Sequence, residues 1–448
     1  MAREVQIGNI LKRIKRPISL IDDQEYKLVT IRMNHKGVVL REKKQGVLIK
    51  SGMYKVKQGD FILSGIDARN GAFGIVPLEL DGAIVTNDFW YFEINEEIIS
   101  KELFLELTAT TWFDEICKRG SDGTTQRIRL QSDKFFNQTI LLPELEEQGE
   151  LLSKIHLIKE KNGILTQEIE SQKSLLSQLK QSILQEAIQG KLTEEWRALR
   201  QAKQAPLEPA SELLKRIQAE KAKLIKEKKI KKEKPLPPIT ESEKPFELPE
   251  GWEWCRLGEI CSKTGSGSTP SGGKSIYQNE GVKFIRSQNV YDDGLRLEDV
   301  AFISEKIHQK MKGTIVEPED LLLNITGGSI GRCCIVPKGF DEGNINQHVA
   351  IIRPFFGFIG YFIHKVICSP YFQEQIIKAQ TGAGREGLPK NKMDNILIAL
   401  PGEEEQQAIV EKVESLMEKC RALEEEISQS EQHAQMLMQA VLKVAFEG

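Results

Sequence analysis

The sequence lacks the features of a membrane protein and of a secreted, disulfide-bonded protein. No apolar run among the 448 residues approaches the roughly 20 residues that a membrane-spanning helix needs, and the amino terminus has no signal-peptide core. The seven cysteines are an odd number without paired spacing, which is typical of a reducing compartment. These absences predict a cytoplasmic protein with no membrane partner.

Signatures of catalysis and of metal binding are also absent. Cys255 and Cys261 have neither a CxxC spacing nor nearby histidines, so we expect no zinc site. The segment Gly265–Ser275 resembles a phosphate-binding loop, but Ser268 stands where that motif requires glycine. HExxH, GxSxG and the Asn/Asp-Pro-Pro-aromatic motif of amino-methyltransferases are missing as well. We therefore expect no catalytic site, no metal and no cofactor in this chain.

A net positive charge is also missing. The formal net charge is −3, with 21 basic and 19 acidic residues in 1–142 and 17 of each in 249–400. The segment 191–248 is basic, with 15 basic and 10 acidic residues, whereas 401–448 is acidic, with 4 and 11. Phosphate neutralisation supplies much of the affinity for DNA, so a DNA-binding function would require weak binding by the chain alone and a basic partner.

What the sequence does contain is an internal duplication. Residues 143–190 align without a gap on 401–448, over 48 positions at a constant offset of 258. The shared residues include, in the first copy, Pro143, Glu146, Glu147, Gln148, Lys154, Leu165, Glu168, Ile169, Leu179, Gln181, Leu184, Ala187 and Gly190. Upstream, Val56–Leu63 matches Val316–Leu323 at an offset of 260. A globular domain and the helix after it are therefore present twice, which agrees with the two or three domains expected at this length.

Each globular domain has the pattern of a mixed α+β fold. Short runs rich in Val, Ile, Phe and Tyr alternate with turn signals and predict strands, which in the first domain are Lys27–Arg32, Gly46–Ile49, Phe61–Leu63 and Phe89–Phe92. Residues 101–118 predict a helix. The second domain opens with Leu248–Trp254 and repeats this strand-rich plan.

The duplicated helices carry a seam of apolar or small residues with 3-4 spacing, which is typical of a coiled coil. In the first copy the seam is Ile155, Ile158, Asn162, Leu165, Ile169, Gln172, Leu176, Leu179 and Ile183. In the second it is Val413, Leu416, Cys420, Leu423, Ile427, Ser430, Ala434, Leu437, Val441 and Val444. At about 1.5 Å per residue each helix is roughly 70 Å long, and the other copy is its expected partner. A helix packed on its own globular domain is the alternative.

Polar residues interrupt both seams at corresponding places. Asn162 and Gln172 in the first copy match Cys420 and Ser430 in the second. Polar seam residues commonly fix the register of a coiled coil at some cost in stability. Simple tolerance of a polar residue explains the pattern equally well.

Residues 191–248 belong to neither copy. Ser211 is expected to cap a helix that runs into Lys221–Lys234 and stops at Pro235. Eight lysines among those 14 residues indicate either a nucleic-acid-binding patch or a solvated, partly disordered connector. The connector is favoured, because the lysines circle the helix without forming a face.

Side chains that can recognise bases occupy matched places in the two domains. Arg286 follows one predicted strand as Arg32 follows another, and Gln347 matches Asn87 at the offset of 260. Arg can pair bidentately with guanine, and Asn or Gln with adenine, which lets a nearly neutral surface recognise a sequence in the major groove. The candidate DNA-binding residues are Arg32, Asn34, His35, Ser64, Arg69, Asn70, Asn87, Arg286, Ser287, Gln288, Asn289, Asn324, Thr326, Ser329, Gln347, His348, Arg385 and Lys390. For each of them, an ordinary exposed loop residue or turn cap is the alternative.

These features together resemble one family, the specificity subunits of type I restriction-modification systems. The segments that carry the resemblance are Gly267–Pro270, Phe284–Asn289, Asp320–Leu323, Gly331–Pro337, Asn346–Gln347, Leu400–Gln407, Gln185–Leu192 and Pro245–Trp252. Nearly the whole chain is covered, although the first domain has no Gly-Ser-Thr-Pro loop and shows a diluted pattern.

The resemblance implies an α+β fold with an internal pseudo-two-fold repeat. Two mixed α/β target recognition domains would be separated by two long helices that form an antiparallel coiled coil. The expected segments are a first recognition domain at 1–142, a central helix at 143–192, a basic linker at 193–247, a second recognition domain at 248–400 and a carboxy-terminal helix at 401–448.

The same resemblance implies the function. Each domain would recognise one half of a split double-stranded DNA target, and the helices would set the spacer. Two modification subunits that use S-adenosylmethionine would dock on the helices, where acidic Glu403–Glu405 and Glu424–Glu426 are candidate contacts. Restriction and translocase subunits that use ATP and Mg would complete the complex, and this chain would be non-catalytic.

Two other functions are consistent with the sequence. The chain could be the specificity module of another restriction or methylation enzyme, which its gene neighbours would reveal. It could also be a coiled-coil scaffold whose globular ends bind protein, which predicts no sequence-selective protection of DNA with any partner.

Overall fold

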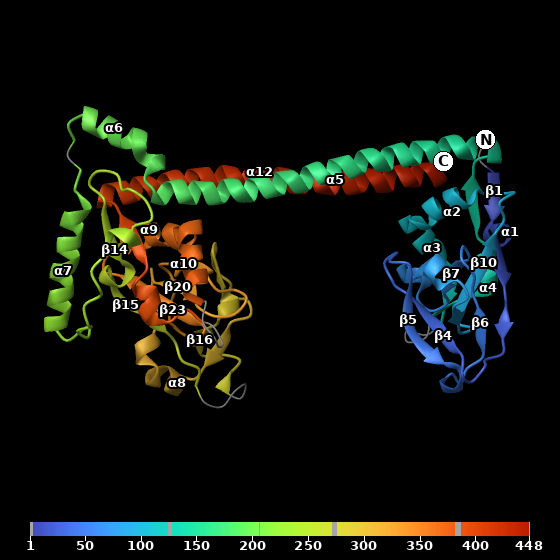
Figure 1. Cartoon of the computed structure of the whole chain (residues 1–448), viewed down its shortest axis with the longest axis horizontal. Helices are drawn as coiled ribbons and strands as arrows, with labels where there is room; N and C mark the ends of the chain where they lie inside the picture. The colour runs from blue at the N-terminus through green and yellow to red at the C-terminus, as the bar shows by residue number, and fades with distance from the viewer. Residues whose placement is uncertain (1–2, 124–127, 206, 271–275, 381–386, 448) are drawn as a thin grey trace. The chain divides into compact units, whose positions relative to one another are not determined.

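The computed structural model describes residues 3–123, 128–205, 207–270, 276–380 and 387–447. They form two compact units, Met1–Gln172 with Glu426–Gly448, and Lys173–Glu425. Each of the two long helices drawn in Figure 1, α5 (Leu145–Ile188) and α12 (Glu403–Glu447), contributes residues to both units. Among the described residues no helix is both long and apolar enough to cross a membrane.

The globular domain of the first unit contains two sheets. The first sheet is fully antiparallel, with the order β2 (Leu11–Ile14), β10 (Phe89–Ile94), β7 (Phe61–Ser64) and β8 (Phe73–Ile75). The second has the order β3 (Pro17–Ile18), β6 (Met53–Lys55), β9 (Ile84–Val85), β4 (Glu25–Ile31) and β5 (Val38–Gln45), with β4 parallel to β9. The pair β1 (Arg3–Gln6) and β13 (Thr139–Leu142) closes the domain next to α5. The strands β11 (Ser121–Asp122) and β12 (Arg129–Leu130) form a separate short pair.

Aromatic side chains fill the space between the first sheet and its helices. The helices are α1 (Ile7–Ile10), α2 (Lys101–Thr108), α3 (Thr111–Arg119) and α4 (Ser132–Phe136). Phe61, Phe92 and Phe104 are fully buried, and the rings of Phe61 and Phe104 meet edge to face with centroids 4.9 Å apart. Such ring pairs add stabilisation beyond their buried area, so this cluster fixes the helices on the sheet.

Two local predictions for the first domain are wrong. The helix predicted at 101–118 is two helices, because Thr110 caps α3 by accepting a hydrogen bond from the Phe113 amide. The predicted strand Gly46–Ile49 is a 3₁₀ turn over Gly46–Leu48. A Cβ at Gly46 would lie 2.1 Å from the Ile21 carbonyl oxygen, so this close approach of two chain segments requires glycine.

The second unit repeats this plan. Its antiparallel sheet has the order β15 (Cys261–Ser266), β23 (Val349–Pro354), β20 (Leu321–Asn324) and β21 (Cys333–Ile335). The other sheet has the order β19 (Ala301–Ile303), β16 (Val282–Ile285) and β22 (Gly343–Ile345), with β16 parallel to β22. The pair β14 (Glu253–Arg256) and β24 (Leu397–Leu400) closes the domain, and β17 (Val290–Tyr291) pairs with β18 (Gly294–Leu295). The helices are α8 (Glu305–Lys310), α9 (Gly357–Ile367), α10 (Pro370–Gln380) and α11 (Lys390–Asp394).

The duplication extends to individual hydrogen bonds. Val76 N donates to the Asp60 carbonyl, and Val336 N donates to the Asp320 carbonyl, which is the same bond 260 positions later. At the start of the long helices, a buried glutamine side chain donates to the preceding proline carbonyl in both copies, Gln148 to Pro143 and Gln406 to Pro401. The predicted α+β fold with an internal repeat is therefore confirmed at the level of backbone pairing.

Within the second unit the two long helices run antiparallel. Lys180 on α5 pairs with Glu424 on α12 at 2.5 Å, whereas Arg197, beyond the end of α5, pairs with Glu405 at the start of α12. The predicted seam is buried mainly at every seventh residue. The buried members are Ile155, Ile169, Leu176 and Ile183 on α5 and Val413, Cys420 and Ala434 on α12. Leu165, Leu179, Leu423 and Leu437, at the alternate positions, remain 40–55% exposed.

The polar seam positions differ in their burial and in their hydrogen bonds. Gln172 is exposed and donates to Glu168 on its own helix, so it forms no contact that could fix the register. Asn162 is half-buried, and its side-chain oxygen has no hydrogen-bond partner among the described residues. Cys420 is 2% exposed and packs as an apolar side chain. Tolerance therefore accounts for Gln172 better than register control does.

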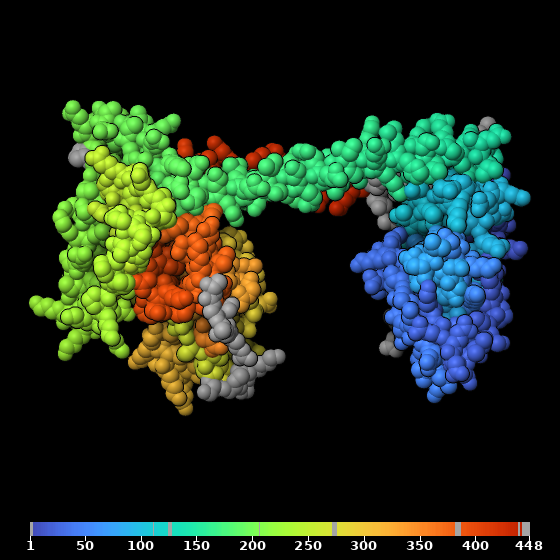
Figure 2. Space-filling model, viewed as in Figure 1, coloured from blue at the N-terminus to red at the C-terminus, as the bar shows by residue number. Residues whose placement is uncertain are grey.

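The linker is packed against the second unit, where Figure 2 shows it in green and yellow-green. It contains α6 (Glu194–Ala202) and α7 (Ala210–Lys226), and Leu213 and Ile217 on α7 are buried. Two predictions for this segment are wrong. The helix begins after Pro209 instead of Ser211, and it ends at Lys226, so most of the lysine run lies beyond it. Leu213 and Ile217 anchor α7, whereas the lysines from Lys226 to Lys234 are exposed, as expected of a solvated segment.

Candidate nucleic-acid interface

Loops from separate strands converge at one end of the second domain. The loop between β20 and β21 is joined to the β22–β23 turn by a bond from Ile325 N to the His348 carbonyl. It is joined to the segment before α11 by a bond from Leu388 N to the Ile325 carbonyl, and Asn324 Nδ2 donates to the Ser287 carbonyl after β16 at 2.9 Å. We call these residues, 286–289, 324–332, 346–348 and 387–388, the second loop face.

The first domain has an equivalent face. Gly65 N donates to the Asp88 carbonyl and Leu130 N to the Gly65 carbonyl, which are the counterparts of the bonds around Ile325. The turn after β4 is attached through Asn34 N, which donates to the Asn70 carbonyl at 2.8 Å. We call residues 32–37, 64–72, 86–88 and 129–130 the first loop face. The two domains thus present the same arrangement of four loop segments.

In each antiparallel sheet, a buried carboxylate lies at the end of the sheet away from the loop face, directly before the strand that leads to that face. Asp320 accepts from Arg353 Nε at 2.6 Å and from its terminal nitrogen Nη2 at 2.7 Å, and it also accepts from Glu317 N. Burial raises the pKa of Asp320, although the bonds to Arg353 oppose that shift. Asp60 is held in the same way by Arg16, which follows β2, while Glu93 stands at the position of Arg353.

The predicted DNA-binding residues fall into two groups: residues that project from the loop faces, and residues whose side chains stabilise the loops through hydrogen bonds within the protein. Seven are exposed on the two faces, namely Arg32, Asn34, His35, Asn70, Asn87, Gln288 and Gln347. Six are half-buried, namely Arg69, Arg286, Ser287, Thr326, Ser329 and His348. Among these, Thr326 hydrogen-bonds to His348. The exposed amides and guanidinium groups remain available for base edges or phosphates.

The side chains of three predicted residues are used inside the protein. Asn324 is fully buried, and its side-chain amide donates to the Ser287 carbonyl and to the Ser329 hydroxyl. Its counterpart in the first domain, Ser64, accepts from the amides of Ile66 and Asp67. Asn289 is 2% exposed and binds backbone groups of Arg286 and Arg296. We therefore assign Asn324, Ser64 and Asn289 to shaping the loops, because buried side chains that are already hydrogen-bonded cannot meet a base.

His35 and Lys390 also have partners within the chain. His35 Nε2 lies 3.0 Å from the Asp114 carboxylate, and its ring meets Phe73 edge to face. Lys390 pairs with Asp394 at 2.5 Å and with Glu233 of the linker at 3.2 Å. Arg385 lies outside the described residues.

One projecting side chain was missed by the sequence analysis. Arg332 is exposed on the second loop face, and its guanidinium lies 4.8 Å from the centre of the Tyr291 ring. The Arg296 guanidinium lies 5.2 Å from the same ring. Stacking on an aromatic ring restrains an arginine without using its hydrogen-bond donors. The stack joins residues 41 positions apart, so no local pattern indicated it; the first domain has buried Ala72 where Arg332 stands.

Glu403–Glu405, the candidate contacts for a partner subunit, have ion-pair partners within the chain, while Glu404 remains exposed, so docking there stays a prediction. Glu403 pairs with Arg216, Glu404 with Arg200 and Glu405 with Arg197, all of them arginines of the linker. Glu405 is 5% exposed and also accepts from Trp252 Nε1 at 2.9 Å and from Thr193.

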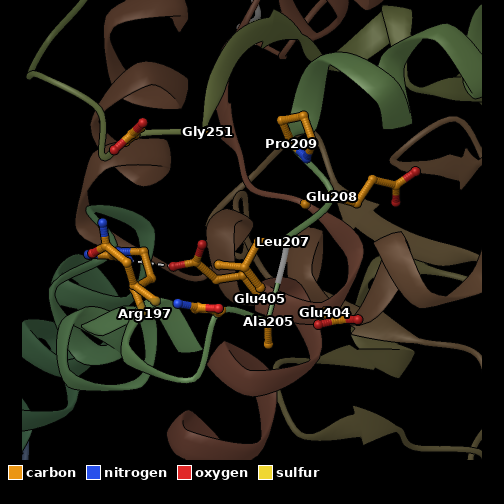
Figure 3. Close-up of a pocket in the computed structure, with 12 residues that line it drawn as sticks. Arg197, Ala205, Leu207, Glu208, Pro209, Gly251, Glu404 and Glu405 are labelled. Carbon is orange, nitrogen blue, oxygen red and sulfur yellow. Dashed lines mark hydrogen bonds and ion pairs between the residues drawn. The ribbon is translucent and has the colours of Figure 1, made fainter. Parts of the chain in front are cut away.

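A cleft of about 540 Å³ lies beside these residues, and Figure 3 shows Arg197 and Glu405 pointing toward one another in its wall. Two glutamates of the lining, Glu404 and Glu405, are neutralised by linker arginines. A third, Glu208, lies 3.5 Å from Arg216. The linker arginines thus anchor the linker to α12.

Comparison with known proteins agrees with this architecture. The model of the type I restriction modification DNA specificity domain matches residues 4–172 and 249–430. The EcoAI specificity subunit of Escherichia coli is 32% identical over 271 residues, and the EcoEI specificity subunit is 31% identical over 278. Each alignment covers 60% of this chain and 44% of the relative, so the matched part spans less than half of those proteins.

Solved structures share the fold over almost the entire chain. A chain from a type I R-M system complex is 20% identical, with a TM-score of 0.64, and the alignment covers 99% of this chain and 97% of the other. The HsdS subunit from Thermoanaerobacter tengcongensis is also 20% identical, with a TM-score of 0.52 and coverage of 100% and 97%. The chain belongs to the family of type I restriction modification DNA specificity domains, and it carries that domain twice.

Proposed function

We propose that this chain is the DNA specificity subunit of a type I restriction-modification complex. Each loop face recognises one half of a split double-stranded DNA target, and the pair α5 and α12 sets the number of base pairs between the halves. The observation that carries the proposal is the pair of loop faces, which share their backbone hydrogen bonds and differ in their projecting side chains. Such an arrangement suits recognition of two different half-sites by one scaffold.

The chemistry of the complex belongs to the partners. Two modification subunits bind S-adenosylmethionine and methylate adenine, and restriction and translocase subunits use ATP and Mg. The chain itself contributes specificity and no catalytic group. Its loop faces carry few cations, so the partners supply much of the phosphate neutralisation that tight binding needs.

The projecting side chains suggest how each half is recognised. On the second face, Gln288 and Gln347 can bind adenine edges and Arg332 can bind guanine or a phosphate. On the first face, Asn87 and Arg32 have these capacities, but buried Ala72 stands where the second face has Arg332. Because the projecting side chains differ in type and position, the two half-sites are expected to differ in sequence.

Sequencing of adenine methylation in cells with and without this gene tests the proposal, with the neighbouring genes intact. We expect one split motif to lose its methylation when the gene is removed. An unchanged set of methylated motifs, in cells where the neighbouring genes are expressed, would contradict the proposal and favour a scaffold function.

A matched deletion tests the spacing role in the same assay. Removal of seven residues from α5 and of the corresponding seven from α12 preserves the heptad phase and shortens each helix by about 10 Å. The gap of the methylated motif should then shrink by about three base pairs at 3.4 Å each, with both half-sites unchanged. An unchanged gap would exclude the helices as the spacer.

A further inference from the structure

The lysine-rich end of the linker forms a concentrated patch of positive charge. Lys221–Lys234 contains eight lysines and two glutamates, Glu227 and Glu233. Lys223 pairs with Glu220 and Lys229 with Glu227. Five exposed lysines have no ion-pair partner among the residues that the structure describes, namely Lys226, Lys228, Lys231, Lys232 and Lys234. We call Lys226–Lys234 the basic segment.

The basic segment is held against the second unit at both ends. At its start, α7 packs through buried Leu213 and Ile217, and Lys229 N donates back to the Leu224 carbonyl at 2.9 Å to end the helix. At its end, the guanidinium of buried Arg256 donates to the carbonyl groups of Pro237 at 2.8 Å and Pro238 at 3.3 Å. The lysines are therefore presented by an anchored segment.

A chain of contacts places the basic segment beside the second loop face. Glu233 pairs with Lys390, whose ammonium group also donates to Thr264 on β15 at 2.7 Å. From Thr264 the chain continues to Gly267, whose amide donates to the Val349 carbonyl next to the β22–β23 turn. Lys390 itself follows Leu388, which is bonded into the loop face. The end of the basic segment, at Glu233, thus lies beside the edge strand β15, which leads to the loops.

The basic segment supplies the excess positive charge that the second globular domain lacks. The second globular domain, 249–400, has equal numbers of basic and acidic residues, so it provides no excess charge for phosphates. Lysines on long, flexible side chains suit the phosphate backbone, which they neutralise without reading sequence. We propose that the basic segment binds the DNA phosphate backbone flanking the second half-site and adds sequence-independent affinity. This inference rests on the proposed function.

A charge-neutralising variant tests the inference in the full chain, co-expressed with the proteins encoded beside it. The variant carries Lys226→Gln, Lys228→Gln, Lys231→Gln, Lys232→Gln and Lys234→Gln, and its matched control carries Arg at the same five positions. Binding to a duplex with the methylated motif and to one without it is measured over a series of salt concentrations. We expect the glutamine variant to bind both duplexes at least ~10-fold more weakly near 0.1 M salt, and the arginine control to bind like the wild type.

The dependence of DNA affinity on salt concentration shows whether a loss of affinity comes from lost phosphate contacts. The slope of log affinity against log salt should decrease by about 0.9 for each phosphate that the variant no longer neutralises, while the methylated motif stays the same. An unchanged slope would overturn the inference, and so would a glutamine variant that fails to co-purify with its partners, since the segment would then bind protein. A wild-type complex that methylates no split motif would instead contradict the proposed function itself.

Discussion

The two globular domains share a backbone and differ in the side chains that stabilise it. In the second domain Asn324 braces the loop face from a fully buried position, whereas its counterpart Ser64 does so through two backbone amides of its own loop. The buried carboxylate stands at the same place in both domains, but its partner Arg353 comes from β23 and its partner Arg16 from the segment after β2. The comparison shows that the hydrogen-bond geometry is retained while the side chains that supply it have been exchanged.

The largest expected effects concern the ion pair between the buried carboxylate and the arginine in each domain. Asp320→Ala leaves Arg353 with only the exposed carboxylate of Glu317, so we expect it to lower the free energy of unfolding of the second domain by about 3–5 kcal/mol. Asp60→Ala leaves Arg16 with only the exposed carboxylate of Glu93, and since the two arginine side chains are about equally buried, we expect a similar loss in the first domain. Urea unfolding with hydrogen exchange resolved by segment measures both losses, and a clearly smaller loss in one domain would mean that its ion pair contributes less to stability.

The next largest expected effect is a difference between the two domains in how their stability depends on pH. His364 is buried on α9, and its counterpart in the first domain is Phe104. Burial lowers the pKa of His364 to about 4 from an ordinary value of 6.5, so below pH 6.5 the unfolded chain binds a proton that the folded domain does not. The second domain should therefore lose up to about 3 kcal/mol of stability between pH 7 and pH 4 through this group.

The control variant gives the second domain the phenylalanine that stands at the matching position of the first domain. The variant His364→Phe removes the titrating group, so its stability should vary less with pH over the same range. Segment-resolved hydrogen exchange at pH 7 and pH 5 separates the two domains. If the wild type and the variant lose stability equally, another group is responsible.

The smallest expected effects concern the projecting side chains. Gln347→Ala and Asn87→Ala alter matched, exposed positions, so neither should change stability measurably. Each should weaken discrimination at one position of one half-site by about 1–3 kcal/mol, roughly 5- to 150-fold. Methylation assays on duplexes with single base changes in each half measure this. If both variants affect the same half, the two loop faces do not act independently.

The sequence predicted the architecture well because the repeat and the seam are periodic patterns. It did not predict which candidate residues face solvent, since burial of Asn289 and Asn324 depends on bonds to loops that are distant in sequence. The stack of Arg332 on Tyr291 has the same origin. The strand predicted at Gly46–Ile49 failed for a local reason, because apolar composition alone does not distinguish a strand from a turn that packs on Ile21.

The way in which each domain is closed has a consequence for its evolution. The chain enters the second domain on β14 and leaves it on β24, and these strands pair antiparallel, with Glu253 opposite Leu400. The first domain is closed in the same way by β1 and β13, with Arg3 opposite Leu142. Both ends of a domain therefore lie side by side, next to the helix that follows. Genetic recombination with crossovers in these two strands would exchange a whole domain between related genes and leave the helices intact, so under the proposed function new pairs of half-sites would arise without new folds.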